Sequence, residues 1–550
     1  MKLSHSYADC LVCCVMVSLL MPCMWAQEEA APKRTGIPQD WSQRHIVFSR
    51  DALALHPDVI YRESRVLHQE MQRWQAPNSG VFHSAGLRPS SANSSSDHRD
   101  WSVSLGKGRL NANTFPAKFS FDPGAPPSCT SDYVVFGLDT AGVTSGQANL
   151  VAFNNLYSGS GGLCGAAPTV MFAYNTTTVA GGKIVTSPIL SEDGTKIAFV
   201  ESVVGAPGSA IFHVLTWTSG QGTISGAAAP ASMTSLTYST SAYNSASSPW
   251  IDYGSDTVYV GADNGVVYQI TGVFKGTPTL SGAPWPVTVS SKYHLTPPVL
   301  DSTLGFLMVG SANGNLYQIN TSTGALAALA VGKKGATGSA IVAAPIVDVT
   351  NGTTFVVTAN DGVSAALVQV KTATMIPHST AEIGQGSTGG TSLTLYEPAF
   401  SNNYFTDPST GFVTLCGTGP FDTTPYQYAF GFTAGQMNET PLIAQPLSAS
   451  ITDRCTGWTE FFNPNINSGV DFFFFGLTQD CTLLGSSGST TGCVVALSSD
   501  PTIPTASALV TGGPSGIVVD NYSTAAQASS IYFTAAHINT AYKLTQDGLQ

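Results

Sequence analysis

Charged side chains are scarce in this sequence of 550 residues: they make up 10% of the chain, against roughly 25% in ordinary soluble domains. Arginine is rarest in the body of the chain, since residues 101–550 contain only Arg109 and Arg454. The formal net charge is −12. A surface that is acidic and poor in arginine does not suit the phosphate backbone of a nucleic acid. We therefore expect no nucleic-acid partner.

Long apolar runs are absent beyond the N-terminus. The run from Leu11 to Trp25 follows Lys2 and precedes the small residue Ala26, which is the pattern of a cleaved secretory signal peptide. The run is also too short for a comfortable membrane span. The sequence predicts that residues 1–26 are a signal peptide and that the rest is exported as a soluble monomer. Lipid anchoring at Cys23 is the alternative.

The exported part of the chain has no C-x-x-C pair, so a cysteine metal site is not expected. Six cysteines remain after the signal peptide, and an even number in an exported chain predicts disulfides. The simplest of the fifteen connectivities joins sequence neighbours: Cys129–Cys164, Cys416–Cys455 and Cys481–Cys493. We expect no metal ion in this protein.

Hydrophobic residues make up 43% of the sequence, which is enough to bury a core, and the chain contains 55 glycines. Such a composition suits short strands joined by tight turns. Residues 27–74 differ from the body and form an N-terminal arm, in which 56–74 has the spacing of one amphipathic helix. Its apolar stripe would consist of Ile60, Leu67, Met71 and Trp74. The composition of residues 75–100 predicts a flexible linker. The arm would dock either on the body or on another protein.

The body, residues 101–550, is repetitive. The phrase "VGSANGNLYQINTSTG" at 309–324 has a near copy, "VGADNGVVYQITG", at 260–272. Both segments follow a proline at the same distance in sequence, Pro298 in the first and Pro249 in the second. Less similar copies of the same repeat occur elsewhere in the body. The eight anchor prolines are Pro116, Pro188, Pro249, Pro298, Pro345, Pro398, Pro464 and Pro514.

Each repeat is interpreted as four antiparallel strands. In the clearest copy these are 298–301, 305–310, 315–320 and 325–331, with a tight turn at Asn313-Gly314. Four strands repeated eight times at about fifty residues are typical of a β-propeller. The sequence thus predicts an all-β fold with eight blades, seven being the alternative, and a short helical arm. A β-solenoid has much shorter repeats, and a β-sandwich array gives no reason for one phrase at a fixed offset.

The repeat phrase resembles the repeats of pyrroloquinoline-quinone (PQQ)-like propellers and their cofactor-free relatives, most clearly over 245–372. Three further segments, "DWSVSLGKGRLNANTFPAKFSFD" at 100–122, "ANLVAFNNLYSG" at 148–159 and "DWSQRHIVFS" at 40–49, are similar to a group of exported bacterial propellers of uncharacterised function. The resemblance implies a propeller in the periplasm, at the cell surface or outside a bacterium, and no activity.

The residues that quinone chemistry requires are missing. Quinoprotein dehydrogenases hold the quinone against a disulfide between adjacent cysteines, and the only adjacent pair here, Cys13-Cys14, lies in the signal peptide. The turn at Thr323-Gly324 also lacks the Asp and Trp of the family's docking phrase. We expect no cofactor.

Hydrolase motifs are missing as well: the chain contains no G-x-S-x-G with triad partners, no H-E-x-x-H and no P-loop. The histidines of the body, His213, His294, His378 and His537, are scattered singly. Each is predicted to be a packed or surface histidine rather than a catalytic base.

Chemistry, if present, is expected near the start of the innermost strands, which line the channel of a propeller. Most residues there are small and uncharged. Carboxylates and aromatic residues that suit a sugar or a cation occur before three of the anchor prolines. The candidate ligand-binding residues are Tyr293, His294, Tyr396, Glu397, Arg454, Trp458 and Glu460. The alternative interpretation is that they are ordinary loop residues with one structural ion pair.

The sequence favours an exported, non-enzymatic propeller that acts as a binding or scaffolding module. Its partner would be a glycan or another extracytoplasmic protein. The alternative is an enzyme on the same fold: a degenerate PQQ-type oxidoreductase, or a carbohydrate-active enzyme that uses Glu397 and Glu460 as an acid–base pair.

Overall fold

The chain divides into two units, Met1–Thr35 and Gly36–Gln550, and the computed structural model describes parts of the second. The described residues are 36–48, 63–66, 68–69, 99–121, 126–159, 161–203, 208–240, 245–291, 293–333, 340–387, 393–463, 469–484, 491–499, 505–520 and 527–545. The signal peptide, the apolar stripe expected at Ile60, Leu67, Met71 and Trp74, and residues 75–98 of the expected linker lie outside these ranges.

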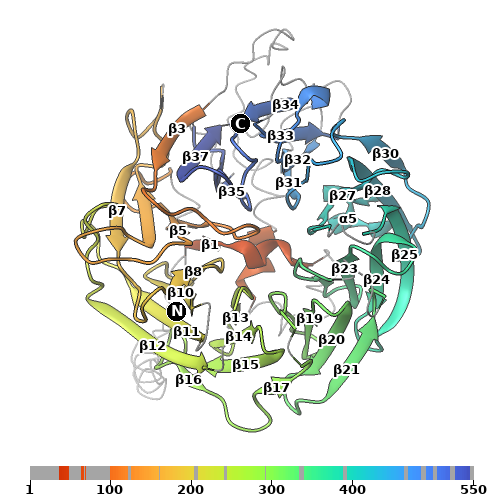
Figure 1. Ribbon diagram of the computed structural model, residues 1–550, viewed down its shortest axis with the longest axis horizontal. Helices are drawn as coiled ribbons and strands as arrows, with labels where there is room; N and C mark the ends of the chain where they lie inside the picture. The colour runs from red at the N-terminus through yellow and green to blue at the C-terminus, as the bar shows by residue number, and fades with distance from the viewer. Residues whose placement is uncertain are drawn as a thin grey trace, which may run out of the picture. The chain divides into compact units, whose positions relative to one another are not determined.

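Within the second unit the strands form eight separate sheets, which Figure 1 shows side by side around a common centre. In each sheet, consecutive strands of the repeat pair antiparallel and run from the centre outwards. The fold is therefore an eight-bladed β-propeller with four-stranded blades, as the sequence predicts, and the alternative of seven blades is wrong.

The first four blades follow one another along the chain. Blade 1 consists of β4(Ala117–Ser120), β5(Tyr133–Gly137), β6(Leu150–Asn154) and β7(Thr169–Tyr174); blade 2 of β8(Lys183–Ile184), β9(Ile189–Leu190), β10(Lys196–Val203), β11(Ser209–Thr216) and β12(Ser232–Ser239). Blade 3 consists of β13(Trp250–Asp252), β14(Thr257–Ala262), β15(Val266–Thr271), β16(Thr279–Leu280) and β17(Val287–Thr288); blade 4 of β18(Val299–Asp301), β19(Phe306–Gly310), β20(Asn315–Asn320) and β21(Leu326–Ala330).

The last four blades complete the ring. Blade 5 consists of β22(Ile346–Asp348), β23(Thr353–Thr358), β24(Ser364–Lys371) and β25(Ile376–Gln385); blade 6 of β26(Ala399–Phe400), β27(Phe412–Thr418), β28(Pro425–Thr433), β29(Gln436–Met437) and β30(Ile443–Pro446). Blade 7 consists of β31(Thr459–Asn463), β32(Val470–Leu477), β33(Cys493–Ser498) and β34(Ala506–Leu509); blade 8 of β35(Val518–Asp520), β36(Ser530–Thr534), β37(Thr540–Thr545) and, from the N-terminal side, β3(Arg99–Ser104).

Helical structure is confined to short pieces in the described residues. These are α5(Asn402–Thr406), the 3-10 turns η1(Trp41–Arg44), η2(Pro408–Thr410) and η3(Thr482–Leu484), and the helical residues 64–66 and 68–69. No helix in the described part of the chain is long and apolar enough to cross a membrane.

The anchor prolines mark the innermost strand in six blades, where the strand begins directly after the proline, from β4 after Pro116 to β26 after Pro398. The last two anchors are wrong. The innermost strand of blade 7, β31, ends at Asn463 before Pro464, and that of blade 8, β35, begins four residues after Pro514. Proline is tolerated at the start of a strand because no ladder hydrogen bond is lost there, but this does not make it obligatory.

Burial along each blade follows the layering of the ring. In blade 4 the second strand β19 is almost wholly buried, whereas the outermost strand β21 alternates between exposed and half-buried residues. The second strand is covered on both faces by the neighbouring blades. Between β19 and β20 the chain reverses at Asn313-Gly314, where Gly314 has φ +84°, a conformation that a residue with a Cβ rarely adopts.

The ring is closed by the N-terminal side of the body. β3 pairs antiparallel with β37 as the outermost strand of blade 8, in register from Ser104 opposite Thr540. Arg99 and Asp100, expected at the end of the linker, already belong to this strand. Trp101 of β3 donates a hydrogen bond from Nε1 to Leu156 O of blade 1 at 3.1 Å, so one segment joins the first blade to the last.

Residues 36–48 of the N-terminal arm lie in the middle of the ring (Figure 1). β1(Ile37–Gln39) pairs with β4 of blade 1, and β2(Ile46–Val47) pairs with β22 of blade 5. Blades 1 and 5 are opposite each other in a ring of eight, so residues 37–47 cross the central channel; Figure 1 shows this segment in red at the centre. Trp41 and Ile46 are 2% and 1% exposed.

Three disulfides join the sequence neighbours Cys129–Cys164, Cys416–Cys455 and Cys481–Cys493. Cys416 lies in β27 of blade 6, and Cys455 lies just before β31 of blade 7. The second disulfide thus connects two neighbouring blades.

Candidate functional site

Two predicted carboxylates come together at the centre of the ring, beside the arm. Glu397 lies just before β26 of blade 6, and Glu460 lies in β31 of blade 7. Both act electrostatically on the guanidinium of Arg44 in η1. The backbone N–H of Trp458 donates to Glu397 O at 3.2 Å, which ties the two blades at this point.

A glycine allows this close approach. A Cβ on Gly457 would lie 2.0 Å from Oε1 of Glu397, which is too close for any side chain. The carboxylate of Glu397 therefore packs directly against the backbone that leads into β31.

Arg44 is half-buried, and its charge is the feature that organises this centre. Burial lowers the pKa of Arg44 to about 9, although Glu397 and Glu460 act in the opposite direction. Burial also raises the pKa of Glu397, and Arg44 offsets part of that rise. The guanidinium carbon lies 5.4 Å from the ring centre of Phe115. One cation of the arm thus faces two carboxylates of the blades.

A cavity of about 80 Å³ separates the arm from blades 6, 7 and 8, and it is lined by residues that include Gln39, Gln43, Arg44, Trp458, Glu460 and Val518. Among the described residues, five buried polar atoms of its lining have no hydrogen-bond partner: Gln39 Oε1, Asp40 Oδ2, Gln43 Oε1, Arg44 Nη1 and Trp458 Nε1. A cavity of this size and polarity suits a few water molecules or a small polar solute.

The ring of Trp458 has no exposed aromatic face. The ring is 1% exposed and stacks on Phe475, with ring centres 4.2 Å apart and planes 3° from parallel. A sugar that stacks on an aromatic ring needs a free face, so Trp458 can offer a ligand only its Nε1 hydrogen.

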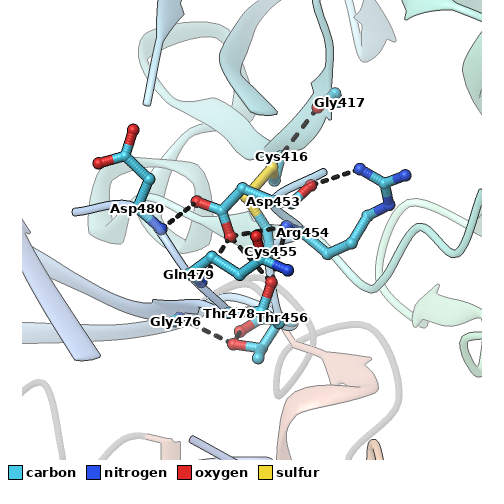
Figure 2. Close-up of a disulfide and its surroundings, with 11 residues drawn as sticks. Cys416, Gly417, Asp453, Arg454, Cys455, Thr456, Gly476, Thr478, Gln479 and Asp480 are labelled. Atoms are coloured by element: carbon cyan, nitrogen blue, oxygen red, sulfur yellow. Dashed lines mark hydrogen bonds between the residues drawn. A yellow bond between two sulfur atoms is a disulfide. The ribbon is translucent and has the colours of Figure 1, made fainter. Parts of the chain in front are cut away.

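Tyr396 and Arg454 belong to a different place, a small recess beside the Cys416–Cys455 disulfide. Figure 2 shows Arg454 next to Asp453 and Cys455. Arg454 donates from Nη1 to Ile451 O at 2.9 Å and to Asp453 O at 2.5 Å. Burial raises the pKa of Tyr396, and a side-chain hydrogen bond with Asn113 acts in the opposite direction. Arg454 is thus directed to its own loop.

Asp453 fixes the loop that carries Arg454. Its carboxylate accepts hydrogen bonds from Thr478 Oγ1 at 2.9 Å, from Gln479 N at 2.9 Å and from Asp480 N at 3.1 Å. Figure 2 shows this fan of bonds from one carboxylate to the β32–β33 connection of blade 7. The disulfide and Asp453 together hold the loop before β31 against both blades.

Tyr293 and His294 lie in a third place, between β17 of blade 3 and β18 of blade 4. The side chain of His294 is 71% exposed, and its Nδ1 is 2.8 Å from Asp263 Oδ1. The hydrogen bond to Asp263 raises the pKa of His294. Tyr293 is 46% exposed.

The seven candidates therefore fall into three groups. Glu397, Trp458 and Glu460 gather near the centre, Tyr396 and Arg454 lie at the disulfide, and Tyr293 and His294 lie on an outer loop. Whether any of them binds a ligand stays a prediction. The residues that sequence reasoning missed are Gln39, Gln43 and Arg44 of the arm. The segment "DWSQRHIVFS" was singled out only by its resemblance, and no periodicity pointed to the channel.

No group of three or more His, Cys, Asp or Glu residues that could hold a metal ion occurs among the described residues.

Comparison with known proteins supports the fold alone. No protein-family model matches the sequence, and no curated protein does so significantly. Among solved structures, Sqt1 from Saccharomyces cerevisiae aligns with 10% identity and a TM-score of 0.50, over 82% of this chain and 98% of that one. BamB from Moraxella catarrhalis aligns with 16% identity and a TM-score of 0.43, over 81% of this chain and 98% of that one. At these identities the similarity concerns the propeller and no activity.

Proposed function

We propose that this protein is an exported, non-catalytic binding or scaffolding module that holds its partner on surface loops of the propeller. The observation that carries the proposal is the course of the arm, which pairs with blades 1 and 5 and crosses the channel. A ligand in the middle of the ring would have to displace Trp41 and Ile46, which are buried. The outer loops carry no such obstruction.

The surface that best fits a partner is formed by the loops of blades 6 and 7. Phe421, in the hairpin between β27 and β28, is 91% exposed, and Ile451, between β30 and β31, is 58% exposed. The two loops touch, because Thr423 Oγ1 donates to Ile451 O at 3.0 Å. Exposed aromatic and branched side chains of this kind gain most when a partner covers them.

A protein partner suits these two side chains better than a glycan does, since both are large and apolar. The partner would be another extracytoplasmic protein. Export is supported by the expected signal peptide and by the three disulfides, which form in oxidising compartments. We place the protein in the periplasm, at the cell surface or outside the cell.

Site-specific photo-crosslinking from position 421 in cells that express the full chain tests the proposal. The matched control is position 442, because Leu442 is also well exposed at 66% but lies at the opposite end of β28. We expect one discrete crosslinked protein from position 421 and none from 442. Retention on purified peptidoglycan or on a glycan array without a protein crosslink would establish the glycan alternative. No specific adduct and no retention would contradict the proposal.

The carbohydrate-active alternative has one observation in its favour, namely that Glu397 and Glu460 both act on Arg44 beside one cavity. The cavity of about 80 Å³ leaves little room for a sugar chain, and the chain's own Arg44 occupies the place of a substrate cation. Hydrolysis of peptidoglycan or glycan substrates by the wild type that is lost in both E397Q and E460Q would favour this alternative over the binding module.

A further inference from the structure

Blade 2 contains a chain of hydrogen bonds that the binding role does not use. Three neighbouring strands contribute one residue each: Glu201 from β10, His213 from β11 and Ser235 from β12. His213 and Ser235 are opposite each other in the β11–β12 register. Nδ1 of His213 is 2.9 Å from Ser235 Oγ, and Nε2 is 2.9 Å from Glu201 Oε2. The arrangement is serine, histidine and carboxylate in line.

Glu201 is rigidly held as the acceptor at one end of this chain. Oε1 accepts from Thr178 N at 2.9 Å and from Val179 N at 3.1 Å, and Oε2 accepts from Thr178 Oγ1 at 2.5 Å. Burial opposes ionisation of Glu201, but the hydrogen bonds from His213, Thr178 and Val179 outweigh it and lower its pKa.

The ionised carboxylate sets the proton positions of the histidine. Glu201 has no proton to donate, so Nε2 of His213 must carry the hydrogen in this bond. In a neutral imidazole Nδ1 then has the free electron pair and accepts from the hydroxyl of Ser235. His213 is therefore oriented to take the proton of the serine hydroxyl, with Glu201 to stabilise the imidazolium.

The serine can be reached from solvent, while the two partners cannot. Both His213 and Glu201 have fully buried side chains, whereas Ser235 is exposed on β12. β12 is the outermost strand of its blade, at the end of the sheet order. Only the Oγ end of the relay meets the surroundings of the protein.

We propose that Ser235 is an activated nucleophile that takes up the acyl group of small carboxylic esters, with His213 as its general base and Glu201 as the positioning residue. Ser235 Oγ attacks the ester carbonyl carbon as its proton passes to His213 Nδ1. The tetrahedral intermediate breaks its bond to the alkoxy oxygen, which leaves as the alcohol with the proton from His213. Water that enters beside Ser235 then gives a proton to His213 Nδ1 and attacks the acyl carbon. The bond to Ser235 Oγ breaks, the carboxylic acid leaves, and the proton on Nδ1 returns to Oγ.

Small esters are the expected class because Ser235 lies on an exposed outermost strand. The residues beside Ser235 on this strand are short and exposed, such as Thr234 and Thr237. The site lies on blade 2 and does not depend on the proposed partner surface of blades 6 and 7.

The test is covalent labelling of the full chain with a fluorophosphonate, with the modified residue located by mass spectrometry, and hydrolysis of p-nitrophenyl acetate as the second readout. We expect the label on Ser235, loss of the label in S235A, and a rate at least about 100-fold lower in H213A. The matched control is S232A, since Ser232 is also exposed on β12 but has no histidine opposite it; its labelling should equal that of the wild type.

Two further measurements distinguish a catalytic relay from hydrogen bonds that only stabilise the blade. If the relay is catalytic, added imidazole should restore labelling in H213A, and E201Q should label more slowly than the wild type at a temperature where circular dichroism shows it to be folded. Ser235 is an exposed surface residue, so we expect S235A to fold. The proposal can therefore be tested with S235A even if H213A fails to fold. Absence of label from Ser235 in the wild type, or equal ester hydrolysis by the wild type and S235A, would overturn the proposal.

Discussion

Arg44 is the cation nearest the centre of the molecule, where the buried Glu397 and the half-buried Glu460 both act electrostatically on its guanidinium. Removing one partner of a buried ion cluster leaves charges without compensation. In R44M, Glu397 and Glu460 would be left in that position. We expect the variant to lose about 0.5–3 kcal/mol of unfolding free energy at pH 7, as measured by urea unfolding.

The same variant should recover as the pH falls. Burial already raises the pKa of Glu397 in the folded state, so the folded protein takes up this proton before the unfolded chain does, and protonation favours folding. The difference between R44M and the wild type should therefore be smaller at pH 5 than at pH 7. R44M/E397Q is the control and should be more stable than R44M at pH 7. An R44M protein as stable as the wild type at pH 7 would show that the cluster does not form.

His45 provides an acid-sensitive point next to Arg44. Burial lowers the pKa of His45 to about 4, a hydrogen bond to Trp41 O acts the other way, and Arg44 adds to the lowering. The unfolded chain binds this proton near pH 6.5. The stability from a neutral His45 is thus complete above pH 6.5 and is lost as the pH falls towards 4, by at most about 3 kcal/mol.

The variant H45Q lacks this titration. Its melting temperature should fall less steeply than that of the wild type between pH 7 and pH 5, when both are followed by circular dichroism. Parallel slopes for the two proteins would mean that His45 is exposed to solvent.

At the scale of the single element, the loop before β31 is held by the Cys416–Cys455 disulfide, which closes a separation of 39 residues. A disulfide restricts the unfolded chain, and more so for a longer loop. C416A/C455A should lose about 2–4 kcal/mol in urea unfolding. C481A/C493A, whose separation is 12 residues, is the matched control and should lose less. The reverse order would contradict the chain-entropy explanation.

The elements themselves were largely predictable where the repeat is regular. The expected strand 315–320 is β20 without change, and 305–310 differs from β19 by one residue. The alternation and the Asn-Gly turn carry that information locally. Pro464 and Pro514 do not mark the first residue of the innermost strand in blades 7 and 8, because the hydrogen bonding of a strand does not require a proline before it.

Only some of the residues at the centre of the ring and in blade 2 could be predicted from the sequence. Glu397 and Glu460 were identifiable because both lie near the start of innermost strands, which the propeller brings to its centre. Arg44 was not, because its partners are more than 350 residues away and only the closed ring brings them together. His213 and Ser235 lie in strands joined by a long connection, and no local pattern sets the register across it.

At the scale of the whole molecule, the arm belongs to the folded core. Truncation to Gly36–Gln550 should leave the melting temperature unchanged, since it keeps β1 and β2. Truncation to Arg99–Gln550 removes Trp41, Ile46 and Arg65, which are 2%, 1% and 0% exposed. Loss of each large buried side chain costs about 3–5 kcal/mol, which together approaches the whole stability of a typical domain. We expect this shorter chain not to accumulate as a folded monomer, by size-exclusion chromatography and circular dichroism.

The arm that crosses the channel is the central claim, because it directs binding to the outer loops. Amide hydrogen exchange of the intact exported protein tests it most directly. The backbone N–H groups of Val347 and Val349 donate to the arm carbonyls of His45 and Val47 at 2.9 and 3.0 Å. Residues 37–47 and the β22 amides should therefore exchange as slowly as the central strands β19 and β23. Exchange of residues 37–47 within seconds, at the rate of an unstructured peptide, would contradict the account.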